Sequence, residues 1–488
     1  MQGSDQVALF TVAELQKVIG AQVLAGDVSG SSGQQIRHLS LDTRTIRPGD
    51  LFVAIRGDRF DGHQFVGLAL SRGAAGALVV DSYDVTKLSR TRNSKRRVPL
   101  ILAVQDPLST YQRLAAYHRN KFRIPVVAVT GSNGKTTTKE MVASVLANRW
   151  KILKTEGNLN NRLGVPQTLF RLHHRHQGAV IEMGVDNVGQ TTSLCEIARP
   201  TVGIITNIGP DHLEFFGSMD VSAQAKAELL DRLPDDGAAI LNADDPYYGY
   251  LASRARCRVV SFGFSTKGDV RATHVESTGR NGTTFRLHLP GKARSTAVQI
   301  RVQGAHNVSN ALAAGAVGTV MGLSGTLIAQ GLSEFRPAAM RSQIVISHGV
   351  KLIIDCYNAN PASMKAAVEL LAQAGENRRT IAVLGDMLEL GPNAVHMHEE
   401  VGEVVARLGI NQLVACGSLG RGLARGAKQA GMDPARIVQV ADAQSAADAA
   451  KMIVRPGDVV LVKASRGMQL ERVVDVIQNV KRTAKKAS

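Results

Sequence analysis

A glycine-rich segment that ends in a lysine carries the clearest chemical prediction in this sequence. The apolar run 126–129 is followed by Thr130, the segment 131–137 and then residues with helical spacing. The two glycines of the segment allow backbone N–H groups to approach anionic oxygens, and the positive end of the new helix points at the same place. The lysine adds a full charge, and the first threonine after it can ligate magnesium. We therefore expect a binding site for nucleotide phosphates, formed by Gly131, Ser132, Asn133, Gly134, Lys135, Thr136 and Thr137.

This segment departs from the general phosphate-loop pattern at one position, where the pattern has a glycine and this sequence has Val129. An ordinary tight turn between a strand and a helix is the alternative interpretation. A Lys-Thr pair directly after the second glycine is hard to explain in that way. We therefore expect an enzyme that consumes ATP or a similar nucleotide.

Three further residues have both a chemical and an ordinary interpretation. Glu182 ends the apolar run 179–182, and His212 follows the apolar run 202–206. Ligands of open α/β sheets bind at the carboxyl ends of strands, and histidine can ligate a metal or contact a phosphate. Lys226 lies on an expected helix. From the residues alone, a solvated glutamate, a structural histidine and a surface lysine remain open alternatives.

Amide side chains gather in two other places. Asn307 and Asn310 are three residues apart, so they share a helix face from which amides can reach a base or a ribose. Helix capping by Asn307 is the alternative. A carboxylate, a tyrosine and two amides follow the apolar run 352–354 and predict a polar binding edge, with a structural turn as the alternative; these residues are Asp355, Tyr357, Asn358 and Asn360.

Composition narrows the class of protein. No apolar run reaches the roughly 18 residues that span a bilayer, and residues 1–5 lack the features of a secretory signal. The four cysteines are scattered without a C-x-x-C pair, which argues against a zinc site and fits a reducing cytoplasm. The net charge of +17 raises the possibility of nucleic-acid binding, but the basic clusters at 87–97 and 481–486 contain no interleaved aromatic residues. We therefore expect a cytoplasmic protein that neither binds nucleic acid nor inserts into a membrane.

The order of apolar and helical segments predicts an α/β protein with three domains. Residues 1–122 would form a small mixed α/β domain, with strands near 51–55 and 75–80 and a helix over 108–122. Residues 123–335 alternate strand-like and helical runs, which predicts a parallel sheet behind the phosphate loop. Residues 336–488 repeat that alternation and predict a Rossmann-like domain.

Taken together, these segments resemble the Mur ligase family, whose members build the peptide stem of bacterial cell-wall precursors. The family loop has the form Thr-Gly-x-x-Gly-Lys-Thr, which accounts for the valine at 129. Residues 355–361, together with 41–44, 48–54, 158–166 and 384–391, look like the branch that adds D-alanyl-D-alanine. Cys356 and Ala464 stand where we expect serine and glycine, and the basic stretch 87–98 has no counterpart that we can name.

The resemblance implies a role for each candidate residue. Lys135, Lys226 and His212 would be catalytic, with Lys226 carbamylated. Two Mg²⁺ ions would be bound, one held by Thr136 and the other by Glu182, His212 and the Lys226 carbamate. Asn307 and Asn310 would hold the adenine, whereas Arg341 and Asp355 would close over the nucleotide. The other substrate would meet Ser40, Asp42 and Arg44 at its uridine part and Asn158, Asn160 and Asn161 at its peptide side. Tyr357, Asn358 and Asn360 would also bind substrate, and 463–466 resembles a stretch near the dipeptide.

The implied activity is ATP-dependent amide formation. D-alanyl-D-alanine would be added to UDP-N-acetylmuramoyl-tripeptide (UDP-MurNAc-tripeptide) through an acyl phosphate, with ATP and Mg²⁺, by a monomeric enzyme. A related ligase that adds a single amino acid, such as a folylpolyglutamate-type enzyme, is the first alternative. A nucleotide-switched binding protein and a nucleic-acid-binding protein are the others.

Overall fold

The computed structural model describes residues 9–26, 34–57, 60–86, 88, 99–278, 282–375 and 377–479. The chain divides into two compact units. The first comprises 1–126, 155–181 and 193–199, and the second comprises 127–154, 182–192 and 200–488. The basic stretch 87–98, apart from Leu88, and the basic tail both lie outside the described residues.

A five-stranded sheet with the order β2-β7-β6-β5-β4 forms the core of the first unit. Strands β4 to β7 are parallel, and β2 is antiparallel to β7. Successive strand residues face opposite sides, so Val53 packs with helices α1 and α3 whereas Phe52 packs with α2. The expected strands at 51–55 and 75–80 and the expected helix at 108–122 are therefore present with slightly different ends. The elements are β1 Phe10–Thr11, α1 Val12–Ile19, β2 Gln22–Ala25, β3 Gln35–Ile36, β4 Leu39–Ser40, β5 Leu51–Val53, α2 Val66–Ser71, β6 Gly76–Val80, β7 Leu100–Val104, α3 Pro107–Asn120 and α5 Gly164–Leu169.

A nine-stranded sheet has the order β16-β15-β14-β13-β12-β11-β8-β10-β9. Strands β8, β11, β12 and β13 are parallel, as the sequence predicts. Strands β14, β15 and β16 add an antiparallel extension that the sequence interpretation did not include. The strands are β8 Val126–Thr130, β9 Ile152–Lys154, β10 Gly178–Glu182, β11 Val202–Ile205, β12 Ala238–Asn242, β13 Arg258–Gly263, β14 Val270–Ser277, β15 Thr283–His288 and β16 Thr296–Ile300.

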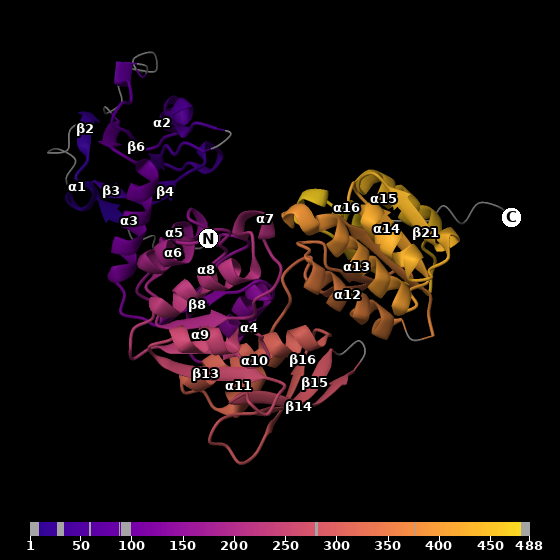
Figure 1. Cartoon of the computed structure of the whole chain (residues 1–488). Coiled ribbons are helices and arrows are strands. Elements are labelled where there is room, and N and C mark those ends of the chain that lie inside the picture. Colours follow the sequence, from indigo (N-terminus) through magenta and orange to yellow (C-terminus); the bar gives the residue numbers. More distant parts are fainter. Residues whose placement is uncertain are drawn as a thin grey trace. The chain divides into compact units, whose positions relative to one another are not determined.

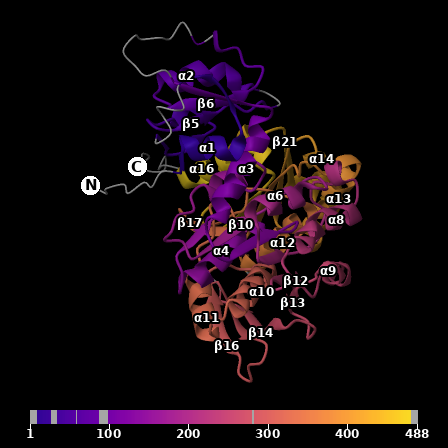
Figure 2. The same ribbon diagram turned by 90° about the vertical axis from the view of Figure 1, so that its left-hand side faces the viewer.

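Helix α4 (Lys135–Ala147) begins directly after the glycine-rich segment. Its side chains Met141, Val142, Val145 and Leu146 are all buried, which confirms the apolar face that the sequence predicts. Helices α10 and α11 pack against α4 in the views of Figure 1 and Figure 2, and the Ser144 hydroxyl donates to the Gly331 carbonyl at 2.7 Å. The helices that accompany this sheet are α6 Gln190–Ala198, α7 Leu213–Phe216, α8 Met219–Asp231, α9 Tyr248–Arg254, α10 Ala305–Val320 and α11 Gly325–Glu334.

A six-stranded sheet with the order β17-β18-β22-β19-β20-β21 forms the C-terminal part of the chain. Neighbouring strand residues belong to different cores: Ile353 packs with α12, α13 and α14, whereas Leu352 packs with α15 and α16. Helices on both faces of a largely parallel sheet are what the sequence predicts here, although the antiparallel edge strand β17 was not expected. The elements are β17 Gln343–Ser347, β18 Val350–Ile354, α12 Pro361–Ala374, β19 Thr380–Gly385, α13 Ala394–Arg407, β20 Gln412–Cys416, α14 Gly420–Gln429, β21 Ile437–Val440, α15 Ala443–Ile453, β22 Val459–Lys463 and α16 Glu471–Asn479.

Among the described residues, no helix is both long enough and apolar enough to cross a membrane.

Candidate active site

The glycine-rich segment forms a tight loop between β8 and α4. Gly131 and Gly134 have φ angles of +131° and +80°, a backbone region that favours glycine. A Cβ atom at Gly131 would lie 2.1 Å from the Thr206 hydroxyl, and one at Gly134 would lie 2.3 Å from Oδ1 of Asn310. Both glycines are therefore required by the backbone angle and by the close approach of neighbouring elements.

The loop is fastened to the segment that follows β11. The Ser132 N–H donates to the Asn207 carbonyl at 2.9 Å, and the Asn133 N–H donates to the Asn207 side chain at 3.0 Å. The Lys135 ammonium donates to the carbonyls of Gly131 and Ser132 at 2.5 and 3.1 Å. Lys135 therefore lies across the same loop whose backbone is expected to hold phosphates.

Asp211 connects this loop to Lys226. Oδ1 of Asp211 accepts from the Ser132 hydroxyl at 2.6 Å and from the Lys226 ammonium at 3.0 Å. Lys226 also donates to the Ser222 hydroxyl at 2.6 Å, and its Nζ lies 4.7 Å from the centre of the Phe216 ring. The Lys226 side chain is 1% exposed. It is therefore a buried residue and not the surface lysine that the sequence alone left open.

The burial of this cluster determines its electrostatics. Burial lowers the pKa of the Lys226 amine, Asp211 opposes that shift, and Lys135 adds to the lowering. Burial alone would raise the pKa of Asp211, but the charges of Lys226 and Lys135 outweigh it and lower that pKa. Oδ2 of Asp211 is buried and has no hydrogen-bond partner among the described residues. The cluster is therefore rich in charge and poor in solvent, as reactive sites often are.

Thr136 and Glu182 lie together beside the loop. The Thr136 hydroxyl donates to Oε1 of Glu182 at 3.1 Å, and both side chains are buried. Nζ of Lys139, also buried, lies 3.7 Å from Oε2 of the same carboxylate. The sequence predicted Thr136 and Glu182 as magnesium ligands, and the structure brings their oxygens together.

His212 is the N-cap residue directly before the short helix α7, with a positive φ of 51°. Its Nδ1 lies 2.5 Å from a carboxylate oxygen of Glu389. Within the described part of the chain, no group of three or more histidine, cysteine, aspartate or glutamate side chains is arranged to hold a metal ion. The role of His212 as a metal ligand therefore stays a prediction.

Asn307 and Asn310 lie on α10, at the point where it packs against the start of α4. Asn310 Oδ1 accepts from the Thr138 hydroxyl at 3.2 Å, and Asn307 donates to the Gln303 carbonyl at 2.7 Å. These bonds show that Asn310 supports the start of α4 beside the phosphate loop, whereas Asn307 bonds to a residue just before its own helix. Their contact with adenine stays a prediction.

The polar edge after β18 is built around Asp355. Its carboxylate accepts from the Lys463 ammonium at 2.6 Å and from the Ser342 N–H at 2.9 Å. The Arg341 guanidinium lies 4.0 Å from the centre of the Tyr357 ring, a cation–π contact. Five residues from three sequence segments therefore meet at one strand end, and the binding roles of Arg341, Asp355 and Tyr357 stay predictions.

Two more amides of this edge have visible contacts. The Asn358 carbonyl accepts from the Lys463 ammonium at 2.9 Å. The Asn360 side chain caps α12 by accepting from the Ser363 N–H at 2.9 Å, and it donates to Oδ1 of Asn133 at 2.7 Å. Asn360 thus has a structural role as a helix cap, and the same side chain also reaches the phosphate loop.

The predicted substrate residues of the first unit form two separate groups. Arg44 and Asp42 make an ion pair at 2.7 Å, and the Ser40 hydroxyl donates to the Asp42 carbonyl at 3.1 Å. The hydrogen bonds from Arg44 lower the pKa of Asp42. In the other group, Oδ1 of Asn161 accepts from the N–H groups of residues 163 and 164 at the start of α5, and the Asn160 N–H donates to the Asn158 carbonyl at 2.7 Å.

Sequence reasoning gave no role to two residues of this site, Asp211 and Asn207, and it included Lys463 only as part of the segment 463–466. Asp211 and Asn207 follow the same strand as His212, and a carboxylate in the polar segment after a buried strand is a signal that could have identified Asp211. Lys463 ends β22 at the same edge as Asp355 and is 3% exposed at its side chain. A lysine within an apolar strand end is the corresponding signal.

Comparison with known proteins identifies the family. The Mur ligase middle domain matches residues 129–318, the Mur ligase glutamate ligase domain matches 340–466, and the Mur ligase family catalytic domain matches 35–118. A Bacillus subtilis protein named UDP-N-acetylmuramoyl-tripeptide–D-alanyl-D-alanine ligase is 34% identical over 463 residues, which cover 94% of this chain and 97% of the relative. The chain belongs to the Mur ligase family.

Solved structures agree with this assignment. A crystal structure of MurF from Acinetobacter baumannii has a TM-score of 0.84 at 31% identity, covering 96% of this Mur ligase and 98% of that chain. MurF from Thermotoga maritima, solved in complex with ADP, has a TM-score of 0.77 at 28% identity, covering 91% and 97%. The expected α/β class with three Mur ligase domains is therefore confirmed, whereas the boundaries at 122/123 and 335/336 stay predictions.

Proposed function

We propose that this Mur ligase uses ATP to join D-alanyl-D-alanine to UDP-N-acetylmuramoyl-tripeptide, which completes the pentapeptide precursor of peptidoglycan. The observation that carries the proposal is the buried chain of contacts from Ser132 through Asp211 to Lys226, because it links a phosphate loop to a reactive amine. The relative from Bacillus subtilis, which bears the name of this activity, supports the choice of substrates. The alternative that adds a single amino acid is not favoured.

The reaction has two bond-forming steps. A carboxylate oxygen of the tripeptide attacks the γ-phosphorus of ATP, the bond to ADP breaks, and an acyl phosphate forms. The amine of D-alanyl-D-alanine then attacks the acyl carbon, loses a proton, and expels inorganic phosphate. Lys135 and the N–H groups of the loop stabilise the charge on the transferring phosphoryl group. These hydrogen-bond donors are held in position before the reaction, so they need no rearrangement when the charge develops.

We propose that two Mg²⁺ ions bind beside the loop, one held by Thr136 and the other by Glu182, His212 and a carbamate on Lys226. The oxygens of Thr136 and Glu182 fit hard cations at neighbouring places, because the hydroxyl and the carboxylate oxygen lie 3.1 Å apart in a buried place. When bound, Mg²⁺ neutralises charge on the phosphate oxygens. The chain's own contribution is to keep these oxygens together and away from bulk water.

We propose that Lys226 reacts with carbon dioxide to form this carbamate. The reaction requires a neutral amine, whose nitrogen bonds to the carbon of CO₂ while a proton leaves. The lowered pKa of Lys226 increases the neutral fraction at a given pH. The hydroxyl of Ser222, 2.6 Å from Nζ, orients the amine.

The remaining predicted contacts complete the proposal. Ser40, Asp42 and Arg44 would bind the uridine part of the acceptor, and Asn158, Asn160 and Asn161 its peptide side. Asn307 and Asn310 would bind adenine, and the edge formed by Arg341, Asp355, Tyr357, Asn358 and Asn360 would close over the nucleotide and the incoming dipeptide. We expect a monomer, which sedimentation equilibrium would show as the mass of one chain.

The choice of amine tests the proposal. Phosphate release is measured with ATP, Mg²⁺ and UDP-MurNAc-tripeptide, and with D-alanyl-D-alanine, D-alanine, glutamate or no amine. Among these amines, we expect only D-alanyl-D-alanine to give phosphate release above background. Mass spectrometry should then detect the pentapeptide product. Omission of the tripeptide is the control for ATP hydrolysis without ligation. Equal or faster turnover with a free amino acid would overturn the assignment.

A further inference from the structure

A chain of four alternating charges runs beside the phosphate loop, from the surface to the carboxylate of Glu182. The Lys154 ammonium donates to Oε2 of Glu140, whose Oε1 lies 3.0 Å from Nζ of Lys139. The Lys139 ammonium in turn lies 3.7 Å from Oε2 of Glu182. The Lys154 side chain is 43% exposed, whereas those of Lys139 and Glu182 are 1% and 2% exposed. Lys139 is therefore a buried cation to which the two reaction steps assign no role.

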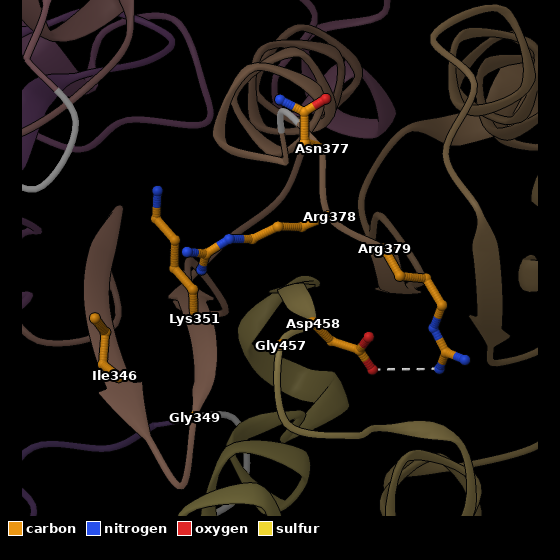
Figure 3. Close-up of a pocket in the computed structure, with 8 residues that line it drawn as sticks. All are labelled: Ile346, Gly349, Lys351, Asn377, Arg378, Arg379, Gly457 and Asp458. Atoms are coloured by element: carbon orange, nitrogen blue, oxygen red, sulfur yellow. Dashed lines mark ion pairs between the residues drawn. The ribbon is translucent and has the colours of Figure 1, made fainter.

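An ion pair in the C-terminal part of the chain shows how Lys139 differs from an ordinary charged residue. Arg379 pairs with Asp458 at 3.3 Å, but the Arg379 side chain is 35% exposed (Figure 3). Pairs that water reaches contribute little to stability. A fully buried ammonium loses much more hydration, and apolar side chains of similar volume often stabilise an interior as well as a buried ion pair does. Stability alone therefore does not explain a lysine at position 139.

The geometry of helix α4 explains what Lys139 contacts. Thr136 and Lys139 are three residues apart, so they share one face of this helix. The Thr136 hydroxyl donates to Oε1 of Glu182 at 3.1 Å, and the Lys139 ammonium lies beside Oε2 of the same carboxylate. Each oxygen of the Glu182 carboxylate therefore meets a side chain from α4, which limits the rotation of the carboxylate.

The charge of Lys139 is balanced on its other side by Glu140. Glu140 is the closer of the two carboxylates, at 3.0 Å against 3.7 Å for Glu182. Burial alone would raise the pKa of Glu140, but the hydrogen bond from Lys154 and the charge of Lys139 outweigh it and lower that pKa. Because Coulomb energy falls with distance, Glu140 offsets much of the repulsion between Lys139 and a cation bound at Glu182. The effect of Lys139 on the direction of the Glu182 carboxylate should then exceed its repulsion of a metal ion.

We propose that Lys139 is a positioning residue for the metal site, which holds the Glu182 carboxylate in one orientation and balances its charge before the ion binds. The inference rests on the proposed function, in which Glu182 is a ligand of Mg²⁺. Residues that hold a metal ligand in place typically change metal affinity roughly 10- to 100-fold when they are removed. Without Lys139, the ion would bind a carboxylate that is less firmly oriented.

Binding of Mn²⁺ to the full-length protein tests this role with a measurement that does not depend on ligase activity. Free Mn²⁺ is followed by electron paramagnetic resonance during a titration with bicarbonate and a non-hydrolysable ATP analogue present. Lys139→Met nearly keeps the length of the side chain and removes its ammonium. We expect this variant to bind the ion at Glu182 about tenfold more weakly than the wild type. In the ligase assay, excess Mg²⁺ should restore most of the turnover that the variant loses, which a general loss of structure would not allow.

Two further variants test whether the effect belongs to the position of Lys139. Lys139→Gln lacks the charge but keeps N–H donors; it should also weaken Mn²⁺ binding, and it replaces Lys139→Met if that variant does not fold. Lys365→Met is the matched control, because the same change removes a lysine that pairs with Glu400 at 2.7 Å from helix α12. The control should bind Mn²⁺ with wild-type affinity. An equal loss of affinity in Lys365→Met would overturn the specific role of Lys139.

Glu182→Gln separates this inference from the proposed metal site. The variant should bind one Mn²⁺ ion fewer than the wild type. Loss of that ion in Glu182→Gln together with wild-type affinity in Lys139→Met would overturn the role of Lys139 and leave the metal site in place. Wild-type Mn²⁺ binding in Glu182→Gln would overturn the metal role of Glu182 and this inference with it.

Discussion

Lys226 is a residue whose surroundings, more than its type, decide its chemistry. It is buried against the Phe216 ring and bonded to Asp211 and Ser222. In water its amine would be protonated at neutral pH, but burial lowers its pKa. The sequence placed it on a helix, where a solvated lysine was the ordinary interpretation. Only the fold brings the residues of α8 and the segment after β11 together to exclude water.

Replacing Lys226 with alanine should lower ligase turnover about 10- to 100-fold, because the carbamate oxygens that help to hold the metal are lost. A short carboxylate such as acetate, added at high concentration, should restore part of the activity. The measurement is turnover with and without acetate, together with a ¹³C NMR carbamate signal from labelled bicarbonate. That signal should be present in the wild-type protein and absent from Lys226→Ala.

Lys292→Ala is the matched control, because Lys292 is exposed on the same domain and should neither lose activity nor remove the signal. Full activity of Lys226→Ala without acetate, or a carbamate signal that persists in it, would contradict the proposed modification.

At the residue scale, a site is easier to predict from the sequence when its side chains are neighbours in the chain. A site that tertiary contacts assemble from distant residues is harder to predict. The tight loop between a strand and a helix was predicted correctly because its signal is local, with Gly131, Gly134 and Lys135 within five positions. Asp211 was missed as a member of the site because its partners Ser132 and Lys226 are 79 and 15 residues away. The pairing of Asp355 with Lys463 spans 108 residues and has no local signal.

At the scale of single elements, the turn between β8 and α4 depends on two glycines that cannot carry a side chain. Gly134 precedes α4 with a φ of +80°, and Oδ1 of Asn310 occupies the place of its missing Cβ. The start of α4 is therefore packed against α10 at Asn310. The direction of the loop N–H groups depends on this packing.

Gly134→Ala should weaken the binding of ATP by at least about tenfold, because the new Cβ must displace Asn310 or the loop itself. Gly291→Ala is a matched control: Gly291 also has a positive φ, of +68°, but no atom lies within 4 Å of its missing Cβ. The control should lose about 1–2 kcal/mol of stability from backbone strain and keep its nucleotide affinity. Calorimetric titration with an ATP analogue measures the affinity of each variant, and thermal unfolding measures its stability. Equal affinities in the two variants would contradict this explanation.

Helix α3 should make the stability of the first unit depend on pH. Burial of His118 lowers its pKa from 6.5 to about 4. Its Nε2 lies 3.0 Å from the Leu172 carbonyl, and its Nδ1 is buried without a hydrogen-bond partner among the described residues. The neutral form is thus favoured by folding, so its contribution is complete above pH 6.5 and is lost as pH falls toward 4.

The expected loss from His118 between pH 7 and pH 4 is roughly 1–3 kcal/mol. His118→Gln, which keeps a donor for the Leu172 carbonyl but does not titrate, should show a smaller decrease of the unfolding midpoint over that range. The measurement is thermal unfolding at pH 7, 6, 5 and 4 for both proteins. Identical pH profiles would show that His118 does not make this contribution.

Strands that are fully buried were predictable, and strands that are half-exposed were not. Strands β8 and β22 are buried at all five positions and read as continuous apolar runs. Strand β14 is exposed or half-exposed at most positions, and β15 carries buried and exposed residues in turn. Their apolar signal is therefore weak, and the antiparallel extension was not expected for this reason.

At the scale of the whole molecule, the sequence predicts three α/β domains because strand and helix signals alternate along most of the chain. The family models match three consecutive regions in the same order. The charge of +17 suits a protein whose substrates carry several phosphate and carboxylate groups. The proposed function assigns the acceptor, ATP and the dipeptide to successive domains.

Transfer of an oxygen atom from the acceptor to phosphate is the most direct test of acyl-phosphate chemistry in this Mur ligase. UDP-MurNAc-tripeptide labelled with ¹⁸O in its reacting carboxylate is incubated with ATP, Mg²⁺ and D-alanyl-D-alanine, and the released phosphate is analysed by mass spectrometry. We predict one ¹⁸O atom in the phosphate for each amide bond formed, because the attacking carboxylate oxygen leaves with the phosphoryl group. Unlabelled phosphate released together with the pentapeptide product would contradict the mechanism.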